Sequence, residues 1–229
     1  MDRSRRGRPR LVLAILALSL LTGPASASEC AALGDFGCYF AFPSVRSAPN
    51  ATLLVFLRGH LDGYGGHVPA AARVQAAREA FVRFRIGDAA RKNRAAALIT
   101  GSSDLSVGSE EIRAVERALG ARFTRIAVAA HSGGADALLP TLAALPRVDR
   151  ILMLDDFYFN SSGPYDEIQS YVQRGAACVG FRTGLTESGY QELLKSKLAC
   201  SVEKYDRDDD HWDKVTECLG AYMSRMSCR

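Results

Sequence analysis

The chain has 229 residues, of which 48% are hydrophobic and 24% are charged, and this composition excludes disordered, collagen-like and coiled-coil proteins. The formal net charge of +4 comes from the N-terminus, because residues 1–27 hold five arginines and one aspartate. Residues 28–229 hold equal numbers of basic and acidic side chains. A neutral body argues against a nucleic-acid-binding surface, and we expect no nucleic-acid partner.

The first 27 residues have the order of a secretory signal peptide. A basic run from Arg3 to Arg10 precedes the apolar stretch Leu11 to Leu21, and the small residues Ala25-Ser26-Ala27 follow. A helix of this apolar stretch would rise about 16 Å, roughly half of the hydrocarbon thickness, which disfavours a membrane anchor. We expect cleavage near Ala27, a secreted or periplasmic protein without a stable membrane span, and a single domain over residues 28–229.

Cysteine usage agrees with export. All six cysteines follow the predicted cleavage point, and an even count in an exported chain predicts disulfide bonds. No two cysteines have the CxxC spacing of a zinc or redox motif. The short separations favour three local pairs, although the sequence leaves other connectivities open: Cys30 with Cys38, Cys178 with Cys200, and Cys218 with Cys228.

Short apolar runs alternate with segments of helical period, which predicts an α/β fold with a mostly parallel sheet and helices on both of its faces. Residues 36–42 are expected to add an antiparallel edge strand. Pro140 is expected to kink or break the helix that contains it, and Ser109 is expected to cap its helix. The predicted strands are Ala51 to Leu57, Ala96 to Thr100, Arg125 to Ala130, Arg150 to Leu154, Ala176 to Phe181 and Cys200 to Tyr205. The predicted helices are Ala70 to Phe84, Ser109 to Leu119, Gly134 to Leu145, Tyr165 to Gln173, Gly189 to Leu198 and Trp212 to Met226.

The most informative segment is Ala130-His131-Ser132-Gly133-Gly134, where an apolar strand runs directly into a helix. A serine at such a tight turn takes strained backbone angles, and the residues two before and two after it must be small. Ala130 and Gly134 meet this requirement. The backbone N–H of Gly133 is then placed to stabilise a carbonyl oxygen that acquires negative charge. The alternatives are a turn that only packs, or a phosphate cradle at a helix N-terminus.

This segment resembles the nucleophile elbow of the alpha/beta-hydrolase superfamily, G-x-S-x-G, with Ala130 in place of the first glycine. The resemblance extends over most of residues 51–229. It implies an alpha/beta-hydrolase fold with a minimal cap or none, and a catalytic triad in the chain order nucleophile, acid, histidine.

His211 is the only histidine after Ser132 and therefore the only candidate of the right order for the base. It follows the last predicted strand, which is where the superfamily places its histidine. The alternative is a surface histidine in an acidic loop. Asp206, Asp208 and Asp210 alternate as calcium ligands do, but the glycine and the distal glutamate of an EF-hand are missing, so we assign no metal.

The acid of the triad has three candidates. Most of the superfamily places it after the next-to-last strand, where this chain offers only Glu187. One strand earlier, the apolar strand ending at Leu154 leads into Asp155-Asp156, and some branches of the superfamily place the acid there. A carboxylate at the carboxyl end of a parallel strand is in the expected position for a site. Asp155 is favoured, with Asp156 and Glu187 as alternatives.

The loop after the first parallel strand is expected to supply the second oxyanion donor. Arg58-Gly59-His60 resembles the superfamily's His-Gly-x segment, with Arg58 in place of the histidine. By this match the backbone N–H of His60 faces Gly133, and Leu61 takes that place if the register slips. Tyr64 and His67 are candidates for the wall of the substrate cleft.

Together these features predict an exported serine hydrolase that cleaves a carboxylic ester through an acyl-enzyme, with Ser132, His211 and Asp155 as the triad. The expected partner is a small-molecule ester or acyl substrate. No metal or organic cofactor is needed for this chemistry. The alternatives are an amide or peptide hydrolase, and a hydrolase-shaped protein that binds a ligand without catalysis.

Overall fold

The structure is a computed structural model that describes residues 29–60, 67–154, 168, 178–183, 199–204 and 219–225. The expected signal peptide lies outside these residues, as do most of the two helices predicted within 165–173 and 189–198. Of the helices in the described part, none combines the length and apolar character needed to cross a bilayer.

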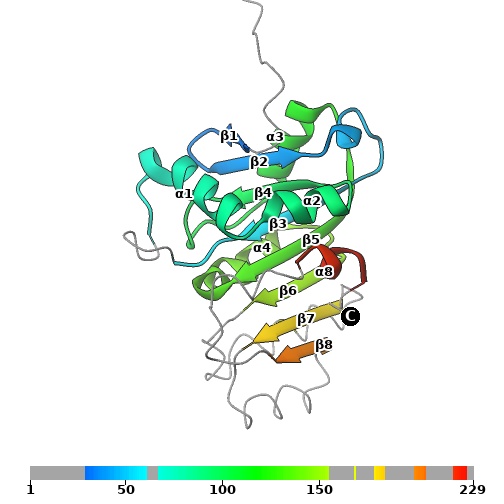
Figure 1. The fold of residues 1–229 in the computed structure, drawn as a ribbon. Coiled ribbons are helices and arrows are strands. Elements are labelled where there is room, and N and C mark those ends of the chain that lie inside the picture. The colour runs from blue at the N-terminus through cyan, green and yellow to red at the C-terminus, as the bar shows by residue number, and fades with distance from the viewer. Residues whose placement is uncertain are drawn as a thin grey trace, which may run out of the picture.

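The described strands form one eight-stranded sheet with the order β1-β2-β4-β3-β5-β6-β7-β8. The strands from β3 to β8 pair in parallel, and β1 and β2 pair antiparallel at one edge. Figure 1 shows the arrows of the parallel strands running the same way. The strands are β1 (Ala31–Leu33), β2 (Gly37–Ala41), β3 (Ala51–Leu57), β4 (Ala96–Thr100), β5 (Phe123–His131), β6 (Arg150–Leu154), β7 (Cys178–Thr183) and β8 (Ala199–Lys204).

Helices cover both faces of this sheet, with α1, α2 and α8 on one side and α3 and α4 on the other (Figure 1). Two 3-10 helices, η1 and η2, precede β3 and α4 in the chain. The bounds are α1 (Ala70–Arg83), α2 (Ile86–Lys92), α3 (Ser109–Leu119), α4 (Leu138–Ala144), α8 (Leu219–Arg225), η1 (Pro43–Val45) and η2 (Ser132–Ala137).

The two-sided packing follows from the alternation of side chains along each strand. In β3, Leu54 and Phe56 belong to the cluster beneath α1, α2 and α8, whereas Leu53, Val55 and Leu57 belong to the cluster beneath α3 and α4. All five side chains are fully buried. A strand buried on both faces needs a continuous apolar run, which is the pattern that predicted it. The predicted fold class, a mostly parallel sheet with helices on both faces, is confirmed.

The predicted helix over 134–145 is wrong in its first part, where the chain forms the 3-10 helix η2 and only then α4. Pro140 explains the late start of the α-helix. A proline has no N–H to donate, so it is tolerated in the first turn, where backbone N–H groups have no intrahelical partner. Because α4 begins at Leu138, Pro140 falls within that first turn.

Two other local expectations are corrected. Ser109 does not cap α3, because the capping position is Gly108, whose backbone N–H donates to the Glu111 carboxylate at 2.8 Å. The helix predicted over Ala70 to Phe84 is observed as α1, but the sequence did not predict the second helix, α2, that follows it. Arg85 joins α1 to α2 with a φ of 50°, a left-handed conformation that breaks the first helix.

Cys30 and Cys38 form a disulfide bond with a Cα–Cα distance of 5.6 Å, as predicted. The bond links the start of β1 to β2 at the antiparallel edge of the sheet, and both cysteines are buried. The other two predicted pairs stay predictions. The Cys30–Cys38 bond therefore secures the edge where a three-residue strand would otherwise be held by few hydrogen bonds.

Replacing both cysteines by alanine should lower the free energy of unfolding by about 2–3 kcal/mol, because the unfolded chain loses the constraint of a short closed loop. Urea denaturation of the oxidised protein measures this difference. A double variant Cys30→Ala/Cys38→Ala that is as stable as the parent protein would show that the bond contributes nothing at this edge.

Candidate active site

The candidate site lies where β3, β4 and β5 end. These strands are parallel neighbours, so the loops that follow them meet at one edge of the sheet. Binding sites in open α/β sheets form at the carboxyl ends of the strands. The loops begin at Arg58, Gly101 and Ser132 respectively.

Ser132 has the strained backbone that the sequence predicted. Its φ is 49°, and it is one of four non-glycine residues with a positive φ in the described part of the chain. A left-handed conformation costs an L-residue about 1–2 kcal/mol. Such strain persists only where the surrounding structure enforces it, and it occurs at active sites more often than elsewhere. The Ser132 side chain is half-buried, between the fully buried His131 and the buried Gly133.

The surrounding structure that enforces this turn is the loop after β3. A methyl group built at Gly59 would lie 2.5 Å from the carbonyl oxygen of His131 and 2.9 Å from Cβ of Ser132. A methyl group at Gly134 would lie 2.2 Å from the carbonyl oxygen of Leu57. Any side chain at either glycine would overlap backbone, so both positions require glycine. The two loops are thus in direct backbone contact, which holds the serine turn in place.

His60 completes this contact on the exposed side of the loop. A methyl group at Gly133 would lie 2.7 Å from both Cδ2 and Nε2 of His60, so the imidazole ring rests against the Cα of Gly133. The sequence predicts a role for the backbone N–H of His60. The structure brings the side chain itself next to the residue after Ser132.

Arg58 is the largest fully buried side chain of the described residues, with 0% of its surface exposed. Its backbone N–H donates to the Thr100 hydroxyl at 3.2 Å, whereas its three guanidinium nitrogens have no hydrogen-bond partner among the described residues. Burial lowers the pKa of Arg58 to about 10, and the nearby charges of Glu79 and Asp104 partly oppose this shift. The guanidinium is therefore still charged at neutral pH, and it places a buried positive charge at the root of the loop that contacts Ser132.

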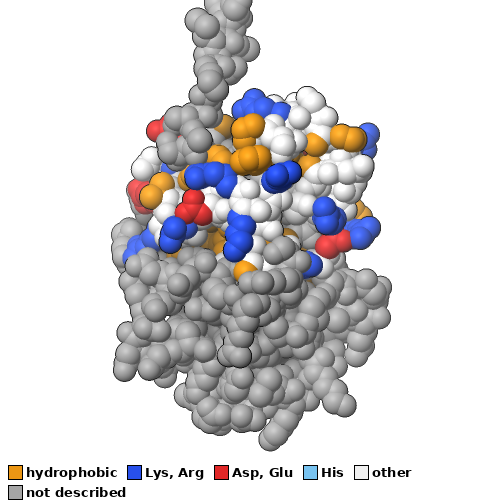
Figure 2. All heavy atoms as spheres, turned by 45° about the vertical axis from the view of Figure 1, so that its right-hand side comes forward, with side chains coloured by type: hydrophobic (Ala, Val, Ile, Leu, Met, Phe, Trp, Pro, Cys, Tyr) orange, Lys and Arg blue, Asp and Glu red, His pale blue; other side chains and the backbone are white. Residues whose placement is uncertain are grey.

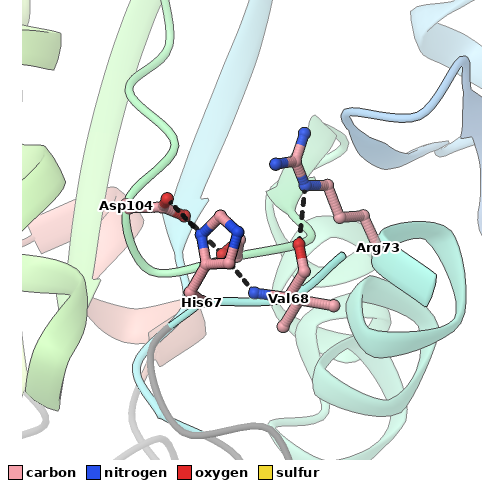
Figure 3. Close-up of polar contacts among 5 residues, drawn as sticks. His67, Val68, Arg73 and Asp104 are labelled. Carbon is pink, nitrogen blue, oxygen red and sulfur yellow. Dashed lines mark hydrogen bonds and ion pairs between the residues drawn. The ribbon is translucent and has the colours of Figure 1, made fainter. Parts of the chain in front are cut away.

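A histidine–aspartate pair stands at the same edge, between the chain leading into α1 and the loop after β4 (Figure 3). His67 Nδ1 lies 2.8 Å from Asp104 Oδ2, and the other carboxylate oxygen of Asp104 accepts from the Ser102 hydroxyl. The hydrogen bond from Ser102, followed by that with His67, lowers the pKa of Asp104. The Ser102 hydroxyl oxygen also accepts from the backbone N–H of Val68 at 3.0 Å.

The His67 side chain is 72% exposed, and its Nδ1 contact leaves Nε2 directed elsewhere. The sequence predicts His67 as a candidate for the wall of the cleft but gives no sign of its pairing with Asp104. Two residues 37 positions apart give no local signal of this kind.

The remaining predicted site residues, Asp155, Asp156, Glu187 and His211, lie outside the described residues, as do Leu61 and Tyr64. The pairing of β5 with β6 shows where the chain leaves the sheet just before Asp155. Leu154, the last residue of β6, pairs with His131, the last residue of β5. The chain therefore leaves β6 at the level at which Ser132 follows β5.

Replacing Ser132 by glycine should give a more stable protein than replacing it by alanine, by about 1 kcal/mol, because only glycine adopts the left-handed conformation without strain. Chemical denaturation of Ser132→Gly and Ser132→Ala gives the comparison. Ala118 on the exposed side of α3 is the matched control. There glycine should lower the free energy of unfolding by about 1 kcal/mol. A glycine variant at position 132 that is less stable than the alanine variant would contradict a strained turn.

The comparisons with known proteins add no evidence about the candidate site. No protein-family model matches the chain, and no curated protein matches it. Among solved structures, the chain is similar to the siderophore hydrolase EstB from Aspergillus nidulans, with a TM-score of 0.40 and 13% sequence identity over 77% of this chain and 82% of that protein. A similarity at this level carries no conclusion about the chemistry of this chain.

Proposed function

We propose that the protein is an exported serine hydrolase that cleaves carboxylic esters, with Ser132 as nucleophile. The observation that carries the proposal is the left-handed Ser132 turn pressed against the Gly59 loop at the carboxyl edge of the parallel strands. In the proposed site this turn holds the Ser132 hydroxyl at the carboxyl edge of the sheet, where the Gly59 loop lies against it. Close packing of two loops around a strained serine is found at functional sites more often than in turns that only pack.

In the proposed reaction, Ser132 Oγ attacks the ester carbonyl carbon while His211 accepts the hydroxyl proton. The N–H groups of Gly133 and His60 stabilise the oxyanion of the tetrahedral intermediate. Collapse of that intermediate breaks the bond to the alcohol, which leaves with the proton from His211. Water then attacks the acyl-enzyme, His211 accepts a proton from it, and the carboxylic acid departs as Ser132 regains its hydrogen.

We expect the buried charge of Arg58 to favour the same step. A buried guanidinium that has no hydrogen-bond partner among the described residues stabilises negative charge near it more strongly than a solvated one does. Arg58 directly precedes Gly59 and His60, so it belongs to the loop proposed to supply the second oxyanion donor.

Asp155 is the proposed acid that orients His211, with Asp156 and Glu187 as the alternatives. The support is the register of the sheet, since Asp155 immediately follows Leu154, which pairs with the residue before Ser132. A carboxylate reaching His211 from this side would fix its tautomer and offset the positive charge that it gains.

Ester hydrolysis is preferred over amide hydrolysis because an alcohol leaves with less assistance than an amine. Export is proposed from the N-terminal segment together with the Cys30–Cys38 disulfide, a bond that persists in oxidising compartments. A protein of the same shape that binds a ligand without catalysis is the competing function, and the following experiment separates the two.

A fluorophosphonate probe should label the oxidised protein, because an activated serine hydroxyl attacks the phosphorus and displaces fluoride. Labelling should disappear in Ser132→Ala and persist in Ser106→Ala, which changes an exposed serine in the loop after β4 at the same edge of the sheet. Gel fluorescence or intact mass measures the adduct. A protein that is folded but never labelled would support the binding function instead.

Substitution of His211 by alanine should lower kcat for a short-chain p-nitrophenyl ester by about 10³-fold or more, because nucleophile and base act as a unit. Asp155→Asn should cause the next largest loss, while Asp156→Asn and Glu187→Gln should leave kcat within a few fold. Each variant is compared at equal folded concentration, judged from its unfolding curve. Loss of kcat in Glu187→Gln with full activity in Asp155→Asn would reassign the acid.

A further inference from the structure

The opposite edge of the sheet, where the parallel strands begin, carries a pocket of about 370 Å³ that the proposed reaction does not use. It lies between the starts of β3, β5 and β6 and the ends of α2 and α8. Its volume is within the range of pockets that bind small molecules. The residues that line it are Thr52, Lys92, Asn93, Arg125, Ile126, Ala127, Asp149, Arg150 and Met223.

The alternation of side chains explains why two arginines meet in this pocket. Arg125 shares a face of β5 with Ala127, and Arg150 shares a face of β6 with Leu152. Ala127 and Leu152 both belong to the core cluster beneath α2 and α8, so both arginines lie on that face of the sheet. Ala127 and Arg150 are partners in the β5–β6 ladder, which brings the two guanidinium-bearing residues onto adjacent strands.

The one carboxylate among the described residues that line the pocket, that of Asp149, already has hydrogen-bond and ion-pair partners. Asp149 Oδ2 accepts from the backbone N–H of Ile126 at 2.8 Å, and Oδ1 lies 2.6 Å from the guanidinium of Arg147. The backbone N–H of Asp149 also donates to the Ile126 carbonyl oxygen at 2.7 Å. Asp149 therefore ties the start of β6 to β5, and its charge also attracts the guanidinium of Arg150.

Positive charge is thus in excess among the described residues that line the pocket, where Lys92, Arg125 and Arg150 accompany the single carboxylate of Asp149. Burial, followed by repulsion from Arg125, lowers the pKa of Arg150, and attraction to Asp149 partly opposes this shift. Figure 2 shows this side of the molecule, and on its described surface blue Lys and Arg side chains outnumber red acidic ones.

The helical wall of the pocket is fixed by Asn93. Its side-chain amide donates to the carbonyl oxygens of Ala89 and Gly220, at 2.8 and 2.7 Å. These two bonds join the end of α2 to α8 and use both amide hydrogens of Asn93. Lys92, next to it, has its Cδ 3.2 Å from the point where a methyl group at Gly220 would lie. The lysine is therefore held at the junction of the two helices.

From this pocket we infer a second binding site, for the phosphate group of a small phosphorylated molecule. A phosphate monoester carries a charge of about −1.5 to −2 at pH 7 and three acceptor oxygens. Guanidinium groups bind such oxygens in pairs, and an ammonium group adds a third donor. The Thr52 hydroxyl supplies a further donor at the start of β3. The pocket is larger than a phosphate ion, which leaves room for the esterified carbon group.

Isothermal titration of the oxidised protein with glycerol phosphate at 0.15 M ionic strength tests the site, with inorganic phosphate and glycerol as separate arms. Saturable binding of the phosphate-bearing ligands and none of glycerol is expected. Tighter binding of glycerol phosphate than of inorganic phosphate would identify a phosphate ester as the ligand, and equal affinities would identify free phosphate. Absence of saturable binding by both would overturn the proposal.

Arg125→Gln and Lys92→Gln should each weaken the binding about 10-fold or more, which is the effect of losing one charge-assisted hydrogen bond. Arg125→Lys should not restore it fully, because lysine cannot donate a pair of parallel hydrogen bonds. Arg122→Gln changes an exposed arginine near the same end of β5 but outside the pocket, and should bind as the parent does. An equal loss in Arg122→Gln would overturn a defined site.

Ser132→Ala should bind glycerol phosphate with unchanged affinity, since the two sites lie at opposite ends of the strands. This variant separates the two proposals. If the protein binds phosphate in the pocket but never reacts with a fluorophosphonate, the second site stands and the proposed hydrolase does not. If it reacts with the fluorophosphonate but binds no phosphate, the hydrolase stands and the second site does not.

Discussion

The arrangement of the candidate site depends on a direct backbone contact between two loops. Gly59 and Gly134 have no side chains, and only for that reason does the chain after β3 approach the turn after β5 to within van der Waals distance. A methyl group at either position would overlap a carbonyl oxygen. The contact fixes the Ser132 turn in its left-handed conformation and brings the His60 ring against Gly133. Strain at one residue is thereby sustained by close packing at several others.

The loop after β3 also carries a residue that is costly for stability. It begins with Arg58, whose side chain is fully buried and whose guanidinium has no hydrogen-bond partner among the described residues. Burying a charge in this way is unfavourable for folding, and the lowered pKa expresses that penalty. Arg58 directly precedes Gly59, whose backbone lies against the Ser132 turn, so one short segment combines a buried charge with the contact that holds the serine.

The two ends of the parallel strands have different character. At the carboxyl ends, glycine-rich loops make close contacts and the polar groups form a connected network through Ser102, Asp104 and His67. At the amino ends, Asp149 ties two strands together, and three basic side chains line a pocket beside α2 and α8. The buried sheet lies between them, so a ligand at one end makes no contact with the other. Two sites on this fold can therefore differ in chemistry without competing for residues.

The sequence by itself determined the parallel strands and the position of the candidate serine. Continuous apolar runs predicted β3, β4 and β6 to the residue, because strands buried on both faces leave no polar alternation to blur their ends. The small residues around Ser132 predicted its strained turn, since that geometry tolerates few residue types. Short separation likewise favoured the Cys30–Cys38 bond.

Only the tertiary structure decided what lies beside what. The packing of α2 against α8, the pairing of His67 with Asp104, and the meeting of Arg125 with Arg150 all depend on contacts between segments that no local pattern connects. The position where α4 begins is also a feature of the tertiary structure. The 3-10 helix η2 extends to Ala137, so α4 begins at Leu138 and Pro140 lies in its first turn. Periodicity reports which face of an element is buried, but it contains no information about which neighbour covers that face, because packing partners are chosen by the whole fold.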